Sequence, residues 1–386
     1  MRAKRTWARP LAPLVYLLRN GGKTAPLVLV ISLAVMLIMG IVSLINSIPL
    51  SIRTIYSYSQ YSLGISPRGD PSLTPRILKD IKEKCPEPIE RIALCRISSA
   101  QVRSVVGKWP FVVLGMERDD MEYFLRKLGS KGIEGRMPEK RKPEVLISRP
   151  VATNLQLRIG STLLSPDTQE AYSPKAVKVV GIADTDQWLM FNDIDYQKEN
   201  HFPPLDNVLV FASDLQTQDK IDHWAMDQFK GERALVFAYY DLDQDTEEMF
   251  RILYRILNVV IGTLVLVITF MMGMLMNIYQ SQRLVEFGLL QALGYTKKQI
   301  LRRVFIETGW VLVVGWALGV VGAIGLLMAV KVTLMDPNAF ALATFDPIAI
   351  RYTVPVPIAI ALIGSFTVWA RFRRFDPVGV VERRLV

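Results

Sequence analysis

The sequence predicts an integral membrane protein of four transmembrane helices, with one large extracytoplasmic α+β domain between the first helix and the second. Three observations lead to this class. Four long apolar runs contain no charged residue, basic residues gather in three of the other segments, and one connection is about 205 residues long. About 20 helical residues cross a hydrocarbon core of roughly 30 Å. The alternative, four buried helices of a soluble protein, requires a core large enough to enclose them all.

Each apolar run is 19 to 23 residues long, which suits one crossing. The runs cover residues 26–45, 256–276, 308–330 and 352–370. With their flanks they give predicted spans at 26–46, 251–279, 304–330 and 352–370, of which the second includes the end of a stalk. The first run is longer than the apolar part of a signal peptide, and no small-residue cleavage site follows it. We therefore expect a retained anchor.

Charge predicts the orientation of these spans. Residues 1–25 hold six Lys or Arg and no acid, residues 280–303 hold five and one acid, and residues 371–386 hold five and two acids. By the positive-inside rule, these three segments face the cytosol. Residues 47–250 and the short external loop 331–351 then lie outside. The net charge of +10 thus reflects the orientation of the protein in the membrane, and it does not indicate a nucleic-acid partner.

The outside domain mixes helix and strand patterns. We expect helices at 75–84 and 118–129, and strands at 111–116, 144–148, 178–183, 207–212 and 234–240. Thr246 can cap a helix whose first turn carries Glu247 and Glu248, and acids favour the positive end of a helix. Because no Pro or Gly follows before Gly262, we expect this helix to continue unbroken into the second span as a stalk.

The chain has two cysteines, Cys85 and Cys95, and both fall in the outside domain. An oxidising compartment permits a disulfide between them. Spacing alone does not establish the geometry of a bridge, so two buried thiols are the alternative.

The sequence carries no recognisable catalytic or metal-binding motif. His201 and His223 are its only histidines and lack the partner spacing of a zinc site, so we expect surface or packing roles. Gly22-Lys23-Thr24 resembles the end of a phosphate-binding loop, but Leu17 stands at the first glycine position and no strand precedes it. We therefore predict that the chain is not an enzyme and binds no cofactor itself.

Residues 281–307 form a basic connection between the second and third apolar runs. Apolar residues recur every three to four positions and give a short helix one apolar face, at Leu284, Phe287, Leu290 and Leu293. Gly294 is typical of a helix end. Thr296 and Gln299 form a capping box that starts the next helix. A capped amphipathic helix on the cytosolic side is suited to binding by another protein.

This connection also carries the strongest likeness to a known family. Residues 286–294, EFGLLQALG, are similar to the pattern E-[IF]-G-x-x-[RKQ]-A-[LVI]-G, which Lys298-Gln299-Ile300 and Glu307 continue. The chain resembles the MacB/FtsX-like permeases of ABC transporters, which include macrolide-efflux, lipoprotein-releasing and cell-division members. Looser matches are Glu134-Gly135-Arg136 with Pro138, the run 144–148, the elbow-like Leu14, Leu17-Leu18-Arg19-Asn20 and Lys23, and a partial C-terminal match at Asp376-Pro377 and Glu382.

The resemblance implies a permease subunit in the bacterial inner membrane. It would couple ATP hydrolysis by a separate ATPase to movement of its outside domain, by mechanotransmission along the stalk, and residues 47–250 would be a MacB-like periplasmic core domain. The coupling helix that contacts the ATPase would comprise Glu286, Phe287, Gly288, Leu289, Leu290, Gln291, Ala292, Leu293 and Gly294. The substrate would be hydrophobic, such as a lipid, lipoprotein, peptide or drug.

The same resemblance implies the partners. ATP and Mg would be bound by an ABC ATPase dimer, a second permease would complete the unit as a homo- or heterodimer, and an extracytoplasmic adaptor protein is a further candidate. A different function stays open, that of a non-transporting transducer that activates an extracellular cell-wall hydrolase or senses a peptide. A membrane-anchored enzyme is a third alternative, which the missing catalytic residues disfavour.

Two features of the membrane-proximal sequence have alternative roles. Basic side chains of the connection could anchor anionic lipid headgroups, at Arg283, Lys297, Lys298, Arg302 and Arg303. Glu307 lies one turn after Arg303, so a local ion pair is expected between them.

In the third span, Gly315 and Gly319 form a small-xxx-small motif that Gly322 and Gly325 extend. We expect close helix packing there, either within the chain against the second or fourth span, or between two subunits.

Overall fold

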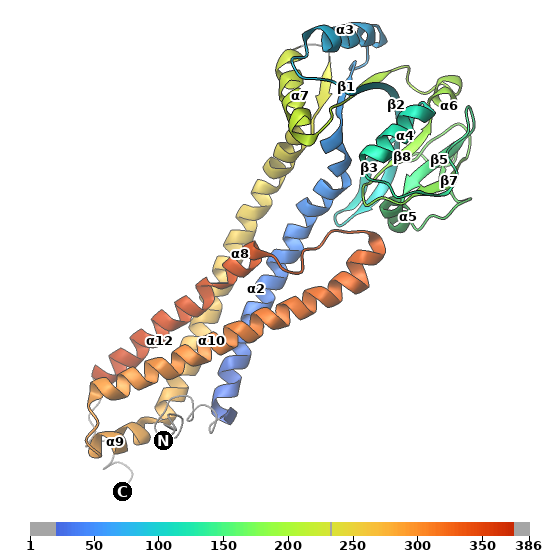
Figure 1. Cartoon of the computed structure of the whole chain (residues 1–386). Helices are drawn as coiled ribbons and strands as arrows, with labels where there is room; N and C mark the ends of the chain where they lie inside the picture. Colours follow the sequence, from blue (N-terminus) through green and yellow to red (C-terminus); the bar gives the residue numbers. More distant parts are fainter. Residues whose placement is uncertain (1–20, 232–233, 374–386) are drawn as a thin grey trace, which may run out of the picture. The chain divides into compact units, whose positions relative to one another are not determined.

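The computed structural model describes residues 21–231 and 234–373 (Figure 1). Most of the predicted elbow segment 1–25 and of the predicted tail 371–386 therefore lies outside the described residues. The chain divides into two compact units, each of which is considered by itself. A helical unit comprises residues 1–45, 253–330 and 343–386, and an α+β unit comprises residues 46–252 and 331–342.

Four helices have the length and apolar composition of membrane spans, as the sequence predicts. They are α2 (Gly21–Ile55), α8 (Tyr239–Gln282), α10 (Lys297–Val330) and α12 (Pro355–Arg373), with the short α11 (Pro347–Thr353) directly before α12. Each of the first three contains one predicted apolar run, and α11 with α12 contains the fourth. The prediction of four such helices is confirmed.

Helix α8 is a single continuous helix of 44 residues, labelled in Figure 1. At 1.5 Å per residue its length is about 66 Å. The predicted unbroken stalk is thus confirmed, but the predicted cap is wrong, because the helix begins at Tyr239 and Thr246 lies inside it. The Thr246 hydroxyl donates to the Leu242 carbonyl oxygen at 2.6 Å. A threonine can satisfy its hydroxyl on the preceding turn, so it does not have to start a helix.

In the helical unit, α10 packs against α2 through a row of glycines. A Cβ atom added to Gly315 would lie 2.9 Å from Ile31 Cβ, and one added to Gly319 would lie 2.7 Å from the Ser32 carbonyl oxygen. Such an approach is open only to a residue without a side chain. The close packing expected of this motif is therefore found within the chain, but its partner is the first span and not the second or fourth. A small-xxx-small motif predicts that another helix packs closely, but it does not predict which helix that is.

Helices α11 and α12 pack against α8 and α10. A Cβ atom on Gly273 of α8 would lie 3.2 Å from Ile363 Cγ2. The Tyr352 hydroxyl donates to Asn258 Oδ1 at 2.7 Å, and Trp316 Nε1 donates to Thr353 Oγ1 at 2.9 Å. Polar side chains on these apolar helices thus find partners on neighbouring helices.

The α+β unit is built on one ten-stranded mixed sheet. Its strands are β1 (Leu63–Ser66), β2 (Arg91–Ser104), β3 (Gly107–Met116), β4 (Ile133–Gly135), β5 (Glu144–Ser148), β6 (Thr162–Leu164), β7 (Val177–Ala183), β8 (Met190–Asp193), β9 (Asn207–Phe211) and β10 (Leu235–Phe237). The order is β10-β1-β9-β2-β3-β8-β5-β7-β4, with β6 beside β7. Strand β2 pairs with β9 through residues 91–95 and with β3 through residues 96–104, so the sheet divides within this strand.

Helices cover both halves of this sheet. They are α3 (Thr74–Lys84), α4 (Arg118–Lys127), α5 (Arg149–Leu155), α6 (Ile194–Glu199) and α7 (Leu215–Gln228), with 3₁₀ turns η1 (Ser57–Tyr61) and η2 (Pro71–Leu73). Ile77 of α3 and Ile221 of α7 pack on β1 and β9. Phe124 of α4 packs on the other side of β9, with its ring centroid 5.0 Å from that of Phe211.

Most of the predicted elements of this unit are present. Both predicted helices correspond to α3 and α4, and the first four predicted strands correspond to β3, β5, β7 and β9. The prediction for 234–240 is wrong at its end, because β10 covers only Leu235–Phe237 and Tyr239 begins α8. The long strand β2 was not predicted, since serines and arginines interrupt its apolar alternation.

The chain after α10 belongs to the α+β unit as far as Leu342. It continues as a π-helical turn (Lys331–Met335) and a 3₁₀ turn η4 (Asp336–Asn338). Asn154, which is fully buried, donates to the Asn338 carbonyl oxygen at 2.7 Å. The Ser51 hydroxyl donates to the Ala341 carbonyl oxygen at 3.3 Å and accepts from its N–H at 3.2 Å. Part of the predicted short loop 331–351 is thus an integral piece of this unit.

Both cysteines are free thiols in the structure. Cys95 is buried on β2 among the residues under α4, whereas Cys85 packs at the end of α3 with the residues under α7. Burial raises the pKa of the Cys95 thiol to about 12. The candidate bridge between Cys85 and Cys95 is therefore not formed here, because the two side chains belong to different core clusters.

Candidate functional site

The predicted short helix between the second and third spans is present as α9 (Leu284–Ala292). Gly294 follows it with a φ of 92°, a conformation that glycine adopts without strain. The Gly294 N–H donates to the Gln291 carbonyl oxygen at 2.9 Å and the Tyr295 N–H donates to that of Leu290 at 3.1 Å. This pair of bonds is a Schellman motif, so the predicted helix stop is confirmed.

The capping box predicted for the next helix is also present. The Thr296 N–H donates to Gln299 Oε1 at 2.9 Å, and the Gln299 N–H donates to Thr296 Oγ1 at 3.4 Å. These reciprocal bonds satisfy two donors at the start of α10. The turn between α9 and α10 is therefore fixed by local hydrogen bonds at both of its ends.

One face of α9 is buried against the chain itself. Phe287 and Leu290 pack with Ile300 and Val304 of α10 and with Val368 of α12. Gly288 is buried beside them. Three residues of the predicted coupling helix, Phe287, Gly288 and Leu290, are thus covered by the chain itself, whereas the predicted contact of this helix with an ATPase stays a prediction.

Four charged side chains lock α9 to its neighbours. Arg283 Nη1 lies 2.6 Å from Glu307 Oε2, and Arg283 Nε lies 3.0 Å from Glu286 Oε2. Arg303 Nε lies 2.9 Å from Glu307 Oε1, and its Nη2 lies 3.5 Å from Glu286 Oε1. The two arginines and two glutamates thus form a closed ring of ion pairs among the end of α8, α9 and α10.

This ion-pair ring is largely buried. The Arg283 and Glu307 side chains are each 3 % exposed, and that of Arg303 is 13 % exposed. The Arg283 guanidinium also lies 5.1 Å from the centroid of the Phe287 ring and 5.4 Å from that of Tyr279. The expected ion pair of Glu307 with Arg303 is confirmed. The lipid-anchor alternative is wrong for Arg283 and Arg303, because both guanidinium groups are turned into the protein.

The opposite face of α9 is apolar and exposed. Leu289 is 57 % exposed and Leu293 is 77 % exposed, with Val285 one turn earlier at 36 %. Residues four apart lie above one another on a helix, so these three side chains form one stripe. Ala292 and Gly294 are exposed at its end. A rigid helix with an exposed apolar stripe is suited to insertion into a groove of another protein.

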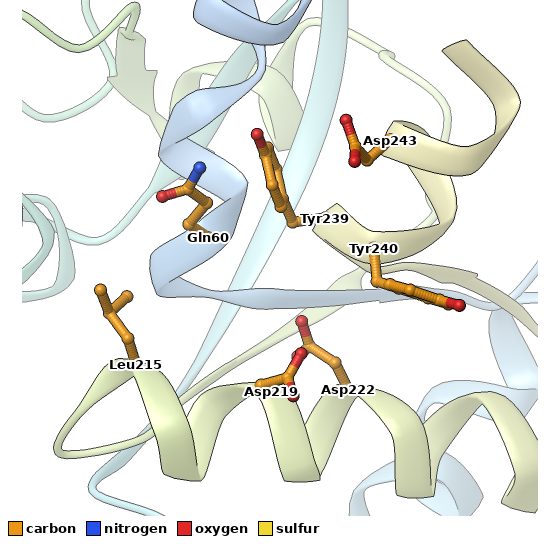
Figure 2. Close-up of a pocket in the computed structure, with 7 residues that line it drawn as sticks. All are labelled: Gln60, Leu215, Asp219, Asp222, Tyr239, Tyr240 and Asp243. Atoms are coloured by element: carbon orange, nitrogen blue, oxygen red, sulfur yellow. The ribbon is translucent and has the colours of Figure 1, made fainter. Parts of the chain in front are cut away.

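A pocket lies at the start of α8, within the α+β unit (Figure 2). Its volume is about 300 Å³, and its lining includes Asp219 and Asp222 of α7, Tyr239 and Tyr240 of α8, and Gln60. Figure 2 shows both α7 carboxylates directed toward the first turn of α8. Burial raises the pKa of Asp222 to about 7, although a hydrogen bond from Gln218 Nε2 opposes that shift.

The rim of this pocket connects two helices of the α+β unit. Asp243 also lines the pocket, and its Oδ1 lies 2.5 Å from Nε of Arg53 on α2. Glu247 Oε1 lies 3.0 Å from Arg53 Nη2.

His223 is exposed, with its ring centroid 4.9 Å from that of Tyr240, as expected for a surface residue. Within residues 21–231 and 234–373, no group of three or more His, Cys, Asp or Glu could hold a metal ion.

The structure thus has four helices long and apolar enough to cross a membrane, an α+β unit, and a capped helix between the second and third of these helices. A family model described as MacB-like periplasmic core domain matches residues 24–225, more than half of the chain, and one described as FtsX-like permease C-terminal matches residues 258–377. The chain belongs to the MacB/FtsX-like family of ABC transporter permeases, multi-pass proteins of the bacterial inner membrane.

Solved structures give weaker likenesses. The periplasmic region of MacB from Actinobacillus actinomycetemcomitans is 13% identical with a TM-score of 0.28, over 48% of this chain and 92% of that one. The extracellular domain of the noncanonic ABC-type transporter YknZ from Gram-positive bacteria is 14% identical with a TM-score of 0.25, over 46% and 99%. A domain of a putative permease protein from Porphyromonas gingivalis is 12% identical with a TM-score of 0.24, over 46% and 89%. None of the curated proteins compared with the chain matches it.

Proposed function

We propose that this chain is the permease subunit of an ABC transporter whose ATP-hydrolysing subunit is a separate protein that binds α9. The observation that carries the proposal is the exposed apolar stripe on a helix that is otherwise fixed to the protein. Leu289 and Leu293 are free to enter a groove, whereas Glu286 is held by Arg283 and Arg303. A force applied to α9 would therefore pass into α8 and α10.

Helix α8 supplies the route by which such a force would reach the α+β unit. It is continuous from Tyr239 to Gln282, so its two ends cannot move independently along the helix axis. ATP and Mg are bound by the partner ATPase dimer in this proposal, and two permeases complete the unit. Its work is the export or extraction of a hydrophobic substrate, such as a lipid, lipoprotein, peptide or drug.

A charged substitution on the apolar stripe tests this proposal. We expect Leu289→Asp to reduce co-purification of the cognate ABC ATPase at least about tenfold, because burying an unpaired carboxylate in a groove is costly. The matched control is Leu215→Asp, which places the same change on a leucine of the α+β unit that is 49 % exposed. Equal ATPase recovery with both variants, at equal permease levels, would remove α9 as the docking site.

The proposed orientation places residues 47–250 and 331–351 outside the cell membrane and residues 1–25, 280–303 and 371–386 in the cytosol. In a Cys85→Ser background, we expect a cysteine at Ser213 to react with a membrane-impermeant thiol reagent in intact cells, or in spheroplasts where an outer membrane is present. A cysteine at Gln282 should react only after the membrane is opened. Both positions are exposed, so accessibility within the protein is matched. Labelling of position 282 alone in sealed cells would reverse the orientation.

A further inference from the structure

An apolar cavity lies where the sheet of the α+β unit divides. Its volume is about 290 Å³. Gly64 of β1 and Leu209 of β9 line it from one half of the sheet, and Ile97 of β2 and Val112 of β3 line it from the other. The division of β2 between two partners leaves this space, because the strand leaves β9 after Cys95 and continues beside β3.

The chemistry of the lining excludes charged ligands. All of the residues that line the cavity are uncharged, and aromatic rings contribute a large part of its wall. The Tyr58 and Phe111 rings meet edge to face at 5.9 Å. An apolar molecule that enters this space exchanges water for contact with an apolar wall, which is favourable. A free carboxylate or phosphate would lose its hydration here with no cation to replace it.

Three buried serines, Ser59, Ser62 and Ser98, add hydroxyl groups to the cavity wall, and that of Ser59 donates to the Tyr56 carbonyl oxygen at 2.7 Å. Ser62 lines the cavity and is 3 % exposed. Ser98 lines it and is 7 % exposed, and its hydroxyl oxygen accepts from Gln197 Nε2 at 3.3 Å. That bond leaves the Ser98 proton available as a donor. Ser62 and Ser98 can therefore offer a hydroxyl proton to a ligand that carries a hydrogen-bond acceptor.

We propose that this cavity binds an ester-linked acyl chain, with the hydrocarbon against Ile97, Val112 and Phe111 and the ester carbonyl accepting from Ser62 or Ser98. An ester is uncharged, carries an acceptor at one end of an apolar chain and therefore matches both parts of the lining. Leu242 of α8 also lines the cavity, so a bound chain touches the helix that continues into the second span. That consequence rests on the proposed function, whereas the binding itself does not.

Photolabelling of the full chain tests the site. The protein is held in an amphipathic polymer, since acyl detergents would compete, and is irradiated with a diazirine analogue of methyl laurate. We expect crosslinks on β2, β3 and η1, and we expect unlabelled methyl laurate to suppress them. Laurate itself, above pH 7 where it is ionised, should compete at least about tenfold less well because the cavity offers its charge no partner.

Matched variants locate the label. Val112→Phe fills the cavity and should lower the crosslinks on β2 and η1 about tenfold, whereas Val106→Phe makes the same change on the exposed turn between β2 and β3 and should not. The double variant Ser62→Ala with Ser98→Ala should reduce the advantage of the ester over a plain alkane competitor several-fold. Crosslinks confined to the apolar helices, or equal competition by laurate and its methyl ester, would overturn the proposal. Because no ATPase is present, neither result bears on α9.

Discussion

Replacing Glu307 with alanine is expected to release α9 from α10 and to lower the stability of the helical unit by about 3–5 kcal/mol, the usual result of breaking a buried ion pair. The change leaves the Arg283 guanidinium, which is 3 % exposed, without its 2.6 Å partner. Arg303 loses its own bond to the same carboxylate. A helix no longer fixed at its base could still bind an ATPase, but it would transmit less of any movement to α8.

Thermal unfolding in detergent and ATPase stimulation measure the two consequences separately. The matched control is Glu122→Ala, which removes an exposed glutamate that lies 3.1 Å from Arg118 on one helix. An exposed i,i+4 pair contributes about 0.3–0.5 kcal/mol, so this control should unfold close to the wild-type temperature. If the two variants unfold at the same temperature, the buried ring of ion pairs does not hold α9 in place.

The parts of this site that follow local rules could be predicted from the sequence. The Schellman motif at Gly294 and the capping box of Thr296 and Gln299 involve residues at most five positions apart, and each signal identifies its own hydrogen bonds. The ion pair of Arg303 with Glu307 is of the same kind, since the residues lie one turn apart.

The parts that depend on tertiary contact could not be predicted. Arg283 and Glu307 are 24 residues apart, and only the packing of α9 on α10 joins them. The same limit applies to Phe287, Gly288 and Leu290, whose burial against α10 and α12 could not be read from the sequence. A pattern of apolar residues identifies a helix face, but it does not show whether that face is covered by the same chain or by a partner.

In the α+β unit, too, elements with a local sequence signal were predicted, and features that depend on distant contacts were not. Strands with continuous apolar residues, such as β5 and β9, were predicted, because complete burial selects such runs. Strand β2 has a mixed pattern because it changes partner midway and borders the apolar cavity. The attachment of Asn338 to Asn154 joins residues 184 apart, and no local signal indicates it.

The glycine row of α10 gives the second large expected effect. We predict that Gly319→Leu will lower the unfolding temperature in detergent strongly, with a loss of about 1–3 kcal/mol or more, as is typical of overpacking. The added Cβ atom alone would lie 2.7 Å from the Ser32 carbonyl oxygen and 2.7 Å from Val35 Cβ, and backbone atoms cannot turn aside as a flexible side chain does. Helix α2 would therefore have to separate from α10.

Gly325→Leu is the matched control on the same helix, because a Cβ atom at Gly325 would meet nothing within 4 Å. It should unfold near the wild-type temperature. Size-exclusion chromatography with light scattering then distinguishes the two origins of the effect. Loss of stability by Gly319→Leu with an unchanged oligomer fits packing of α10 on α2 of the same chain. Selective loss of the oligomer at unchanged stability would instead place this face between subunits, and it would contradict the intrachain contact of Gly319 with Ser32.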